Sequence, residues 1–146
     1  MPGASVIEIK AKMLEKNIHF LKKLIGEDVI FSSVVKGNAY GHGIEVVVPV
    51  IRKCGIDHFS VFSSEEARRV YRVINGDASI MIMGYIAETD LKWVIDHNIE
   101  FFVSDMERVK KALALWVETG QKANIHIEVE TGMNRTGFRP KDLNEL

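Results

Sequence analysis

The chain has 146 residues, which is enough for one domain with a sizeable core. With 19 basic and 20 acidic residues its net charge is −1, so it lacks the basic footprint of a nucleic-acid-binding protein, and no apolar run reaches the roughly 20 residues that span a bilayer. Cys54 is the only cysteine and the N-terminus lacks the basic and apolar regions of a signal peptide, which together predict a cytoplasmic protein without an internal disulfide.

Strand-like and helix-like segments alternate along the whole chain. Short β-branched or apolar runs predict strands, the first of them buried, and apolar residues spaced three and four apart predict helices. The predicted strands are 29–35, 58–62, 79–83, 99–103 and 124–130. The predicted helical faces cover 11–25, 44–51, 67–74, 90–97 and 106–117. The apolar stripe of the last helix indicates packing rather than a cofactor site.

Local signals set the expected ends of these helices. Two capping boxes, Ser63–Glu66 and Ser104–Glu107, predict helix starts. Three helices are expected to end at Gly26, Gly55 and Gly120. Pro49 is awkward in the second helical segment because proline has no amide hydrogen. It fits if that helix begins near Glu45 or Val46, or if the helix kinks.

Repeated strand–helix units predict a parallel sheet. Two architectures fit this order. One is a five-stranded doubly wound sheet, which is complete at this length. The other is a (β/α)8 barrel, which needs about 250 residues, so the chain would form only its first five strand–helix units. The periodicity alone does not choose between them.

A lysine follows the first predicted strand directly, in VVKGNAYGHG (residues 34–43). Removing an ammonium from water is costly, and the neutral amine that burial favours is the form that attacks a carbonyl to make a Schiff base. Lys36 is therefore a candidate nucleophile, the alternative being a side chain that extends from the strand end into solvent. Tyr40 and His42 in the same loop are either functional or ordinary loop packing.

The fifth predicted strand alternates apolar with ionisable residues, and its polar face carries His126, Glu128 and Glu130. This alternation also fits a strand with one face exposed to solvent. A parallel strand, however, is normally covered on both faces, which favours a polar site on the face that carries these residues. The glycine-containing loop that follows carries Arg135. If the loop turns back over the strand, Arg135 pairs with Glu128 or Glu130 and presents its guanidinium to a carboxylate ligand.

Two segments resemble the signatures of bacterial alanine racemases. Residues 34–43 resemble the family's pyridoxal-phosphate lysine motif, and EVETGMNRTGF (128–138) resembles its second signature. The resemblance extends from about Val6 to Phe138 and implies the barrel rather than the doubly wound sheet. Residues 1–146 are then expected to be the N-terminal part of the pyridoxal-phosphate-binding barrel, with the remaining strands and a C-terminal β-domain outside the chain.

The resemblance also implies roles for individual residues. Lys36 corresponds to the lysine that forms a Schiff base with pyridoxal 5′-phosphate and acts as one of two acid–base groups. Tyr40 stands where the family places a donor to the cofactor phosphate, and Arg135 where it places an arginine near the phenolic oxygen and the substrate carboxylate. Many members carry a lysine that can be carbamylated at the position of Glu128, so Glu128 is expected to supply the anion that supports Arg135. No metal site is predicted.

The implied activity is the interconversion of L- and D-alanine, which supplies D-alanine for peptidoglycan. The family's opposing catalytic tyrosine belongs to the C-terminal β-domain and comes from the other subunit of a homodimer. The chain alone is therefore expected to be inactive and to associate with another copy or a complementary fragment. Two alternatives remain: a racemase of serine or of broad specificity, and a non-catalytic module that binds pyridoxal phosphate or a partner.

Overall fold

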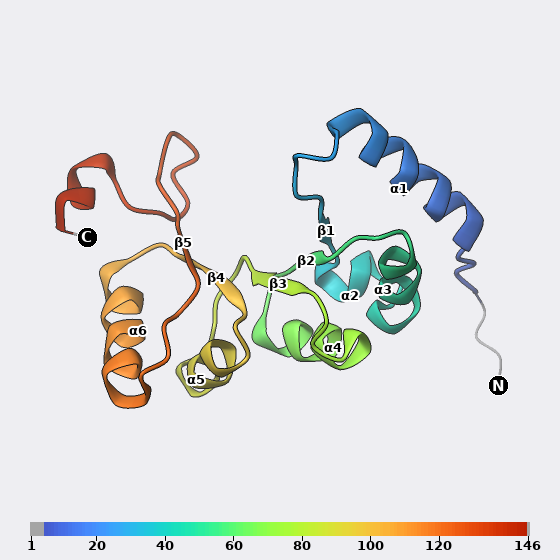
Figure 1. The fold of residues 1–146 in the computed structure, drawn as a ribbon. Helices are drawn as coiled ribbons and strands as arrows, with labels where there is room; N and C mark the ends of the chain where they lie inside the picture. Colours follow the sequence, from blue (N-terminus) through green and yellow to red (C-terminus); the bar gives the residue numbers. More distant parts are fainter. Residues whose placement is uncertain (1–4, 146) are drawn as a thin grey trace.

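The computed structural model describes residues 5–145 (Figure 1). Its strands are β1 Ser32–Val34, β2 His58–Val61, β3 Ser79–Ile82, β4 Glu100–Val103 and β5 Ile125–Ile127. Its helices are α1 Ala11–Ile25, α2 Lys36–Tyr40, α3 Ile44–Lys53, α4 Ser64–Ile74, α5 Glu88–Asp96, α6 Met106–Thr119 and the 3-10 helix η1 Pro140–Glu145. Every predicted strand and helix is present, and α2 is an additional short turn in the lysine loop. None of the helices in this range is long and apolar enough to cross a membrane.

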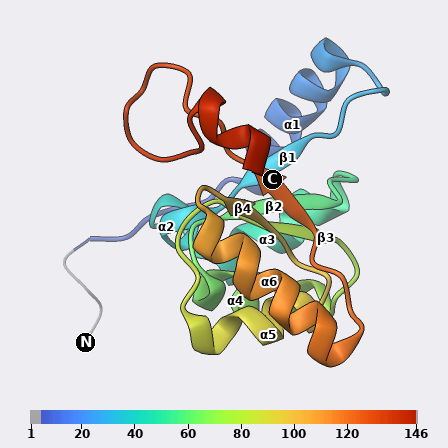
Figure 2. The same cartoon turned by 90° about the vertical axis from the view of Figure 1, so that its left-hand side faces the viewer.

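The strand order decides between the two architectures. The strands lie in the order β1-β2-β3-β4-β5, and each pairs in parallel with the next. Helices α3 to α6 lie on one side of this sheet in both ribbon views (Figures 1 and 2). A doubly wound sheet reverses its strand order and carries helices on both faces. The doubly wound alternative is therefore wrong, and the fold is a sector of a βα barrel.

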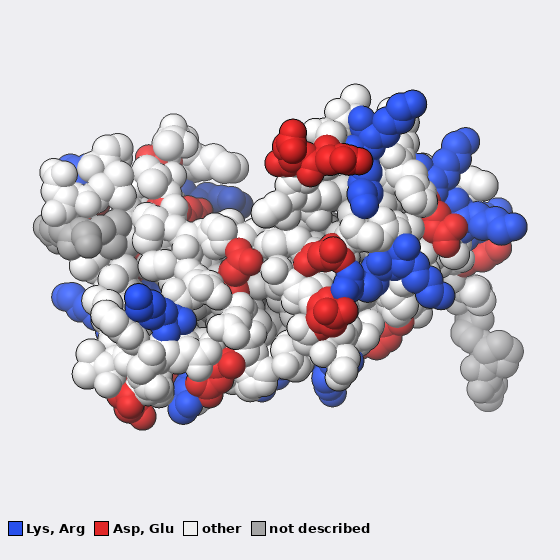
Figure 3. All heavy atoms as spheres, viewed as in Figure 1, with Lys and Arg blue, Asp and Glu red and all other residues white. Residues whose placement is uncertain are grey.

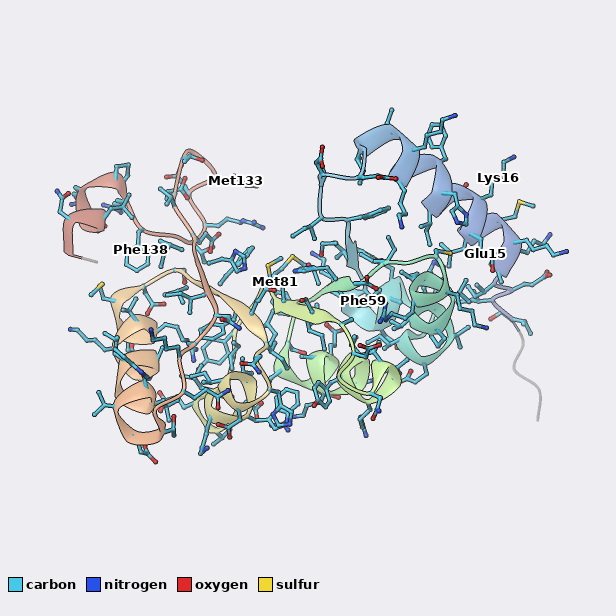
Figure 4. All side chains as sticks on the ribbon, in the orientation of Figure 1. Glu15, Lys16, Phe59, Met81, Met133 and Phe138 are labelled. Carbon is cyan, nitrogen blue, oxygen red and sulfur yellow. The ribbon has the colours of Figure 1, made fainter. Side chains whose placement is uncertain are left out.

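The core lies between the sheet and its helices. Phe59 on β2 and Phe101 on β4 are fully buried there, because alternate residues of a strand point to the helix side. Met81 belongs to the opposite, open face of the sheet (Figure 4). The surface is hollowed above that face, between α1 and the segment that follows β5 (Figure 3). In a closed barrel this face would line the interior.

The first strand is shorter and less buried than predicted. Only Ser32–Val34 pairs with β2, whereas Val29 and Ile30 are 54% and 79% exposed. Within the described residues β1 has a neighbouring strand on one side only. The apolar run 29–35 would be buried only with a neighbouring strand on each side, and β2 is its one neighbour in the part of the chain that the structure describes.

The apolar stripe of α6 packs only in its first half. Met106 and Val109 contact the core, but Leu113, Trp116 and Val117 are exposed. In the described residues α6 has a helix neighbour, α5, on one side only (Figure 1). The prediction that the whole stripe serves packing is therefore wrong for Leu113, Trp116 and Val117, although Leu115 beside them packs against the core.

The helix ends differ from the predictions in detail. Ser63 caps α4 by accepting a hydrogen bond from the Glu66 amide at 3.3 Å, but the Glu66 carboxylate binds the amide of Phe62 instead of completing the box. The cap of α6 is Asp105 rather than Ser104. Helix α3 begins at Ile44, so Pro49 is its sixth residue. Pro49 therefore lies beyond the first turn, where its missing amide removes one helical hydrogen bond.

Candidate active site

The lysine loop is a left-handed turn. Lys36 follows β1 after Val35, and Gly37, Asn38, Ala39 and Tyr40 then have φ values of 60°, 55°, 54° and 55°. The Ala39 amide donates to the Val35 carbonyl at 2.8 Å, which closes the turn. The left-handed conformation costs about 1–2 kcal/mol for each residue other than glycine. Three consecutive non-glycine residues therefore require strong support from the surrounding structure.

That support comes from α4 through Asn38. The Asn38 amide donates to Glu66 Oε1 at 2.9 Å, and Asn38 Oδ1 accepts from the Ile44 amide at 3.1 Å and from Arg69 Nη2 at 2.6 Å. Arg69 also forms a two-point ion pair with Glu45, at 2.8 and 2.6 Å. The sequence predicts neither contact. Glu66 is recognised only as part of a capping box, and Arg69 lies on the polar side of its helix.

We expect the Arg69–Glu45 pair to contribute to stability in a definite pH range. The hydrogen bond from Arg69 lowers the pKa of Glu45 from its ordinary 4.5 to about 2. A lowered pKa in the folded state means that the pair stabilises the fold above about pH 4.5 and that this contribution is lost as the pH falls toward 2. The thermal midpoint of the wild type should therefore fall more between pH 5 and pH 3 than that of Glu45→Gln.

The measurement is thermal unfolding followed by circular dichroism at several pH values. Glu118→Gln is the matched control, because Glu118 forms no ion pair in residues 5–145 and its replacement should leave the wild-type slope unchanged. Parallel pH profiles for the wild type and Glu45→Gln would contradict the assignment.

A cavity of about 610 Å³ at the carboxyl ends of the strands brings together three of the predicted site residues. Lys36, Glu128 and Arg135 all line it. They come from the end of β1 and from the segment after β5, nearly 100 residues apart in the chain. The volume lies within the range of about 300–1,000 Å³ that is typical of small-molecule sites, and the carboxyl end is where barrel proteins place their active sites.

The loop after β5 is held by the two glutamates, but not in the predicted way. Glu128 Oε1 accepts from the Thr136 hydroxyl at 2.9 Å, and Glu130 Oε2 accepts from the Arg135 amide at 3.2 Å. Loop amides, first that of Asn134, lower the pKa of Glu130. Among residues 5–145 no ion pair joins the Arg135 guanidinium to either carboxylate. The carboxylates fix the loop itself and leave the Arg135 side chain available to a ligand.

The polar face of β5 lies on the open side of the sheet. His126 Nε2 lies 2.6 Å from Glu100 Oε2 on β4, and Glu128 lines the cavity on the same face. Tyr40 lies elsewhere. It is 64% exposed and lines a second cavity, which it shares with Lys36 and Arg69. Lys36 is therefore the one predicted site residue that borders both cavities.

Sequence reasoning missed the aromatic wall of the larger cavity. Phe62, Tyr85 and Phe102 line it, at or just beyond the ends of β2, β3 and β4. Arg108 lies above the Tyr85 ring, 5.4 Å from its centre, and donates to the Ile86 carbonyl at 2.6 Å. All three stand at strand ends in the sequence. That position would have predicted a place in the site only if the chain had first been taken to form a barrel.

The strands and helices form a singly wound sector of a βα barrel. A lysine at the end of its first strand and an arginine in the loop after its fifth strand line one cavity. The chain belongs to the alanine racemase family. The family model described as "Alanine racemase, N-terminal domain" matches residues 9–146.

Individual relatives agree with this assignment. Alanine racemase 1 of Caldanaerobacter subterraneus subsp. tengcongensis is 31% identical over 137 residues, which cover 94% of this chain and 35% of that protein. The crystal structure of alanine racemase from Bacillus anthracis with bound L-Ala-P superposes with a TM-score of 0.81 and 29% identity, covering 92% of this chain and 34% of the other. The chain thus spans about a third of the length of the relatives it matches.

A histidine racemase from Leuconostoc mesenteroides subsp. sake shares the fold as well. Its structure superposes with a TM-score of 0.79 over 90% of this chain and 35% of its own. At 22% identity this likeness concerns the fold alone. It agrees with the barrel sector.

Proposed function

We propose that this chain is the cofactor-binding barrel portion of a pyridoxal-phosphate-dependent alanine racemase. The observation that carries the proposal is that Lys36 and Arg135, from the two family signatures, line one cavity at the carboxyl end of the sheet. Membership of the family supports the racemase chemistry. The supply of D-alanine for peptidoglycan, in the cytoplasm, is the physiological role that this activity implies.

The cavity residues fit pyridoxal phosphate. Lys36 offers a half-buried primary amine, and Phe62, Tyr85 and Phe102 offer aromatic surface for a planar ring. Arg135 offers a cation without an ion pair in residues 5–145. When bound, the cofactor supplies the electron sink that stabilises negative charge at the substrate α-carbon.

The protein's own groups would then bind, orient and transfer protons. The Lys36 amine would hold the cofactor and move a proton at one face of the α-carbon. The Arg135 guanidinium would bind the substrate carboxylate with two parallel hydrogen bonds. Tyr40 would donate its hydroxyl to the cofactor phosphate from the second cavity, on the other side of Lys36. Glu128 would keep the Arg135 loop in place through Thr136.

The complete reaction requires a second proton-transfer group on the opposite face of the substrate. We propose that this group lies outside the 146 residues and comes from the partner subunit of a homodimer. The chain's coverage of only about 35% of its relative's length supports this division. By itself the barrel portion would bind the cofactor without racemising an amino acid.

The test is attachment of the cofactor. Pyridoxal phosphate added to the protein should shift its absorbance from that of the free aldehyde to that of a Schiff base, and borohydride should fix the added mass on the peptide that contains Lys36. Labelling spread evenly over surface lysines would contradict the proposal. Racemisation assays on alanine, serine and histidine with the whole protein decide the substrate, and cofactor attachment without racemisation of any of them would favour the binding module.

Glu128 offers a prediction that separates its charge from its hydrogen bond. Glu128→Ala removes the acceptor of Thr136, so the Arg135 loop loosens and the KM for the amino acid should rise about tenfold, with a smaller change in kcat. Glu128→Gln keeps an acceptor for Thr136 and should change KM by about twofold or less. Steady-state kinetics of the whole protein measure both. A Gln variant as impaired as the Ala variant would show that the negative charge supports Arg135 instead.

A further inference from the structure

The lysine turn is joined to the end of β2 by a single carboxylate. Glu66 on α4 accepts two backbone hydrogen bonds, from the Asn38 amide at 2.9 Å and from the Phe62 amide at 3.0 Å. Asn38 lies two residues after Lys36 in the left-handed turn, and Phe62 lines the same cavity as Lys36. One side chain therefore fixes two separate walls of the candidate site to each other.

A second side chain on the same helix completes the support. Arg69 donates to Asn38 Oδ1 at 2.6 Å while its ion pair with Glu45 fixes it to α3. Asn38 is thus bound through both its backbone and its side chain. These bonds oppose the relaxation of the turn toward a right-handed conformation, which would redirect the Lys36 side chain.

We propose that Glu66, assisted by Arg69, is a positioning residue that holds the Lys36 amine toward the larger cavity by fixing the left-handed turn. The inference rests on the proposed function in that cofactor attachment is its chemical readout. Glu66 itself touches no reacting atom. Its contribution is to keep the amine within attacking distance of the cofactor carbonyl, where a misplacement of about 1 Å costs up to 10²-fold in rate.

The chemistry of glutamine makes Glu66→Gln a sharp test. Two backbone N–H groups need two acceptors, and a carboxylate provides both. Glutamine provides one carbonyl oxygen and replaces the other with an NH2 group, which is itself a donor. One of the two amides, of Asn38 or Phe62, then faces a donor, so the connection between the turn and β2 is broken although the side chain keeps its size.

The experiment compares the wild type, Glu66→Gln and Glu118→Gln. Glu118 lies on α6 and lines neither cavity, and its side chain makes no hydrogen bond within the described part of the chain, so its variant removes the same charge away from the site. Borohydride trapping of pyridoxal phosphate on Lys36 should fall about tenfold or more in Glu66→Gln and stay within about twofold of the wild type in Glu118→Gln. Equal trapping in the two variants would overturn the proposal.

Two further readouts do not depend on the cofactor. Hydrogen exchange of the Asn38 amide should accelerate about tenfold in Glu66→Gln only, and the acetylation of Lys36 relative to Lys53 should change in the same variant. If both remain as in the wild type, Glu66 has no positioning role. Failure of the wild type itself to trap pyridoxal phosphate would instead refute the proposed function, while these two readouts still decide the role of Glu66.

A second variant covers the case in which Glu66→Gln does not fold. Arg69→Lys keeps the positive charge but cannot reach Asn38 and both oxygens of Glu45 in the same way. Its Asn38 exchange should accelerate and its Lys36 trapping should fall by about threefold. Wild-type values for both in a folded Arg69→Lys protein would overturn the network.

Discussion

Lys36→Ala is expected to eliminate borohydride-fixed attachment of pyridoxal phosphate to the peptide that contains residue 36. In the whole protein it should reduce racemase activity by at least about 10³-fold, because the residue both attaches the cofactor and transfers a proton. The amine is half-buried between two cavities, and it is the only predicted site residue that borders both. Mass spectrometry of the reduced protein and a coupled racemisation assay measure the two effects.

The matched control is Lys53→Ala, at the end of α3 and away from both cavities. It should attach the cofactor and racemise at wild-type rates. Thermal unfolding of Lys36→Ala should stay close to the wild type, since the Lys36 side chain belongs to no ion pair in residues 5–145. Cofactor attachment that persists in Lys36→Ala at the wild-type level would assign the chemistry to another amine.

The order of the elements could be predicted from the sequence because strand and helix periodicities are local properties. The run 58–62 and the cap Ser63 lead directly to β2 and α4, and β2 ends one residue before its predicted end. Strands β1 and β5 at the two sides of the sheet are shorter than predicted, with three residues each. The architecture could not be predicted in this way. Strand order depends on which segments pair across the sheet, and only the observed order β1-β2-β3-β4-β5 excludes the doubly wound alternative.

The site was predictable to the level of its lysine and its arginine loop. Lys36 and Arg135 stand in short segments whose residue types are unusual, and the fold brings them to one cavity. The partners of each were not predictable. Arg135 was expected to pair with Glu128 or Glu130, but Glu128 binds the Thr136 hydroxyl and Glu130 binds the backbone amide of Arg135.

The left-handed conformation of the lysine turn could not be predicted from the sequence either. The segment 34–43 was expected to form a loop, but a positive φ at Ala39 and Tyr40 is not expected of these residue types. The conformation is supported by Glu66 on α4, which lies 28 residues further along the chain and accepts a hydrogen bond from the Asn38 amide. Long-range support of this kind leaves no periodic trace in the sequence.

Gly84→Ala is the second change with a large expected effect, and its cause is steric. Gly84 follows β3 and lines the larger cavity beside Phe62. A Cβ at Gly84 would overlap the Phe62 carbonyl oxygen and lie 2.7 Å from carbon atoms of the Phe62 ring. Phe62 cannot move away freely. Its amide is bound to Glu66, and β2, which ends just before it, is paired with β3.

We therefore expect Gly84→Ala to separate the ends of β2 and β3 and to destabilise the fold by about 2–3 kcal/mol, the upper part of the range for overpacked interiors. For a chain of this length that corresponds to a fall of about 5–10 °C in the thermal midpoint. Gly120→Ala is the comparison, because Gly120 has a φ of 75° at the end of α6 but an added Cβ there meets no atom within 4 Å. Its cost should be limited to the left-handed conformation, about 1–2 kcal/mol.

The two variants also distinguish a loss of stability from a change in the cofactor site. Because Gly84 and Phe62 both border the cavity, Gly84→Ala should slow the trapping of pyridoxal phosphate on Lys36 even at temperatures where the protein remains folded. Gly120→Ala should leave that rate unchanged, since Gly120 lies at the far end of α6 from the cavity. Equal unfolding midpoints and equal trapping rates in the two variants would show that the close approach of Gly84 to Phe62 has no structural consequence.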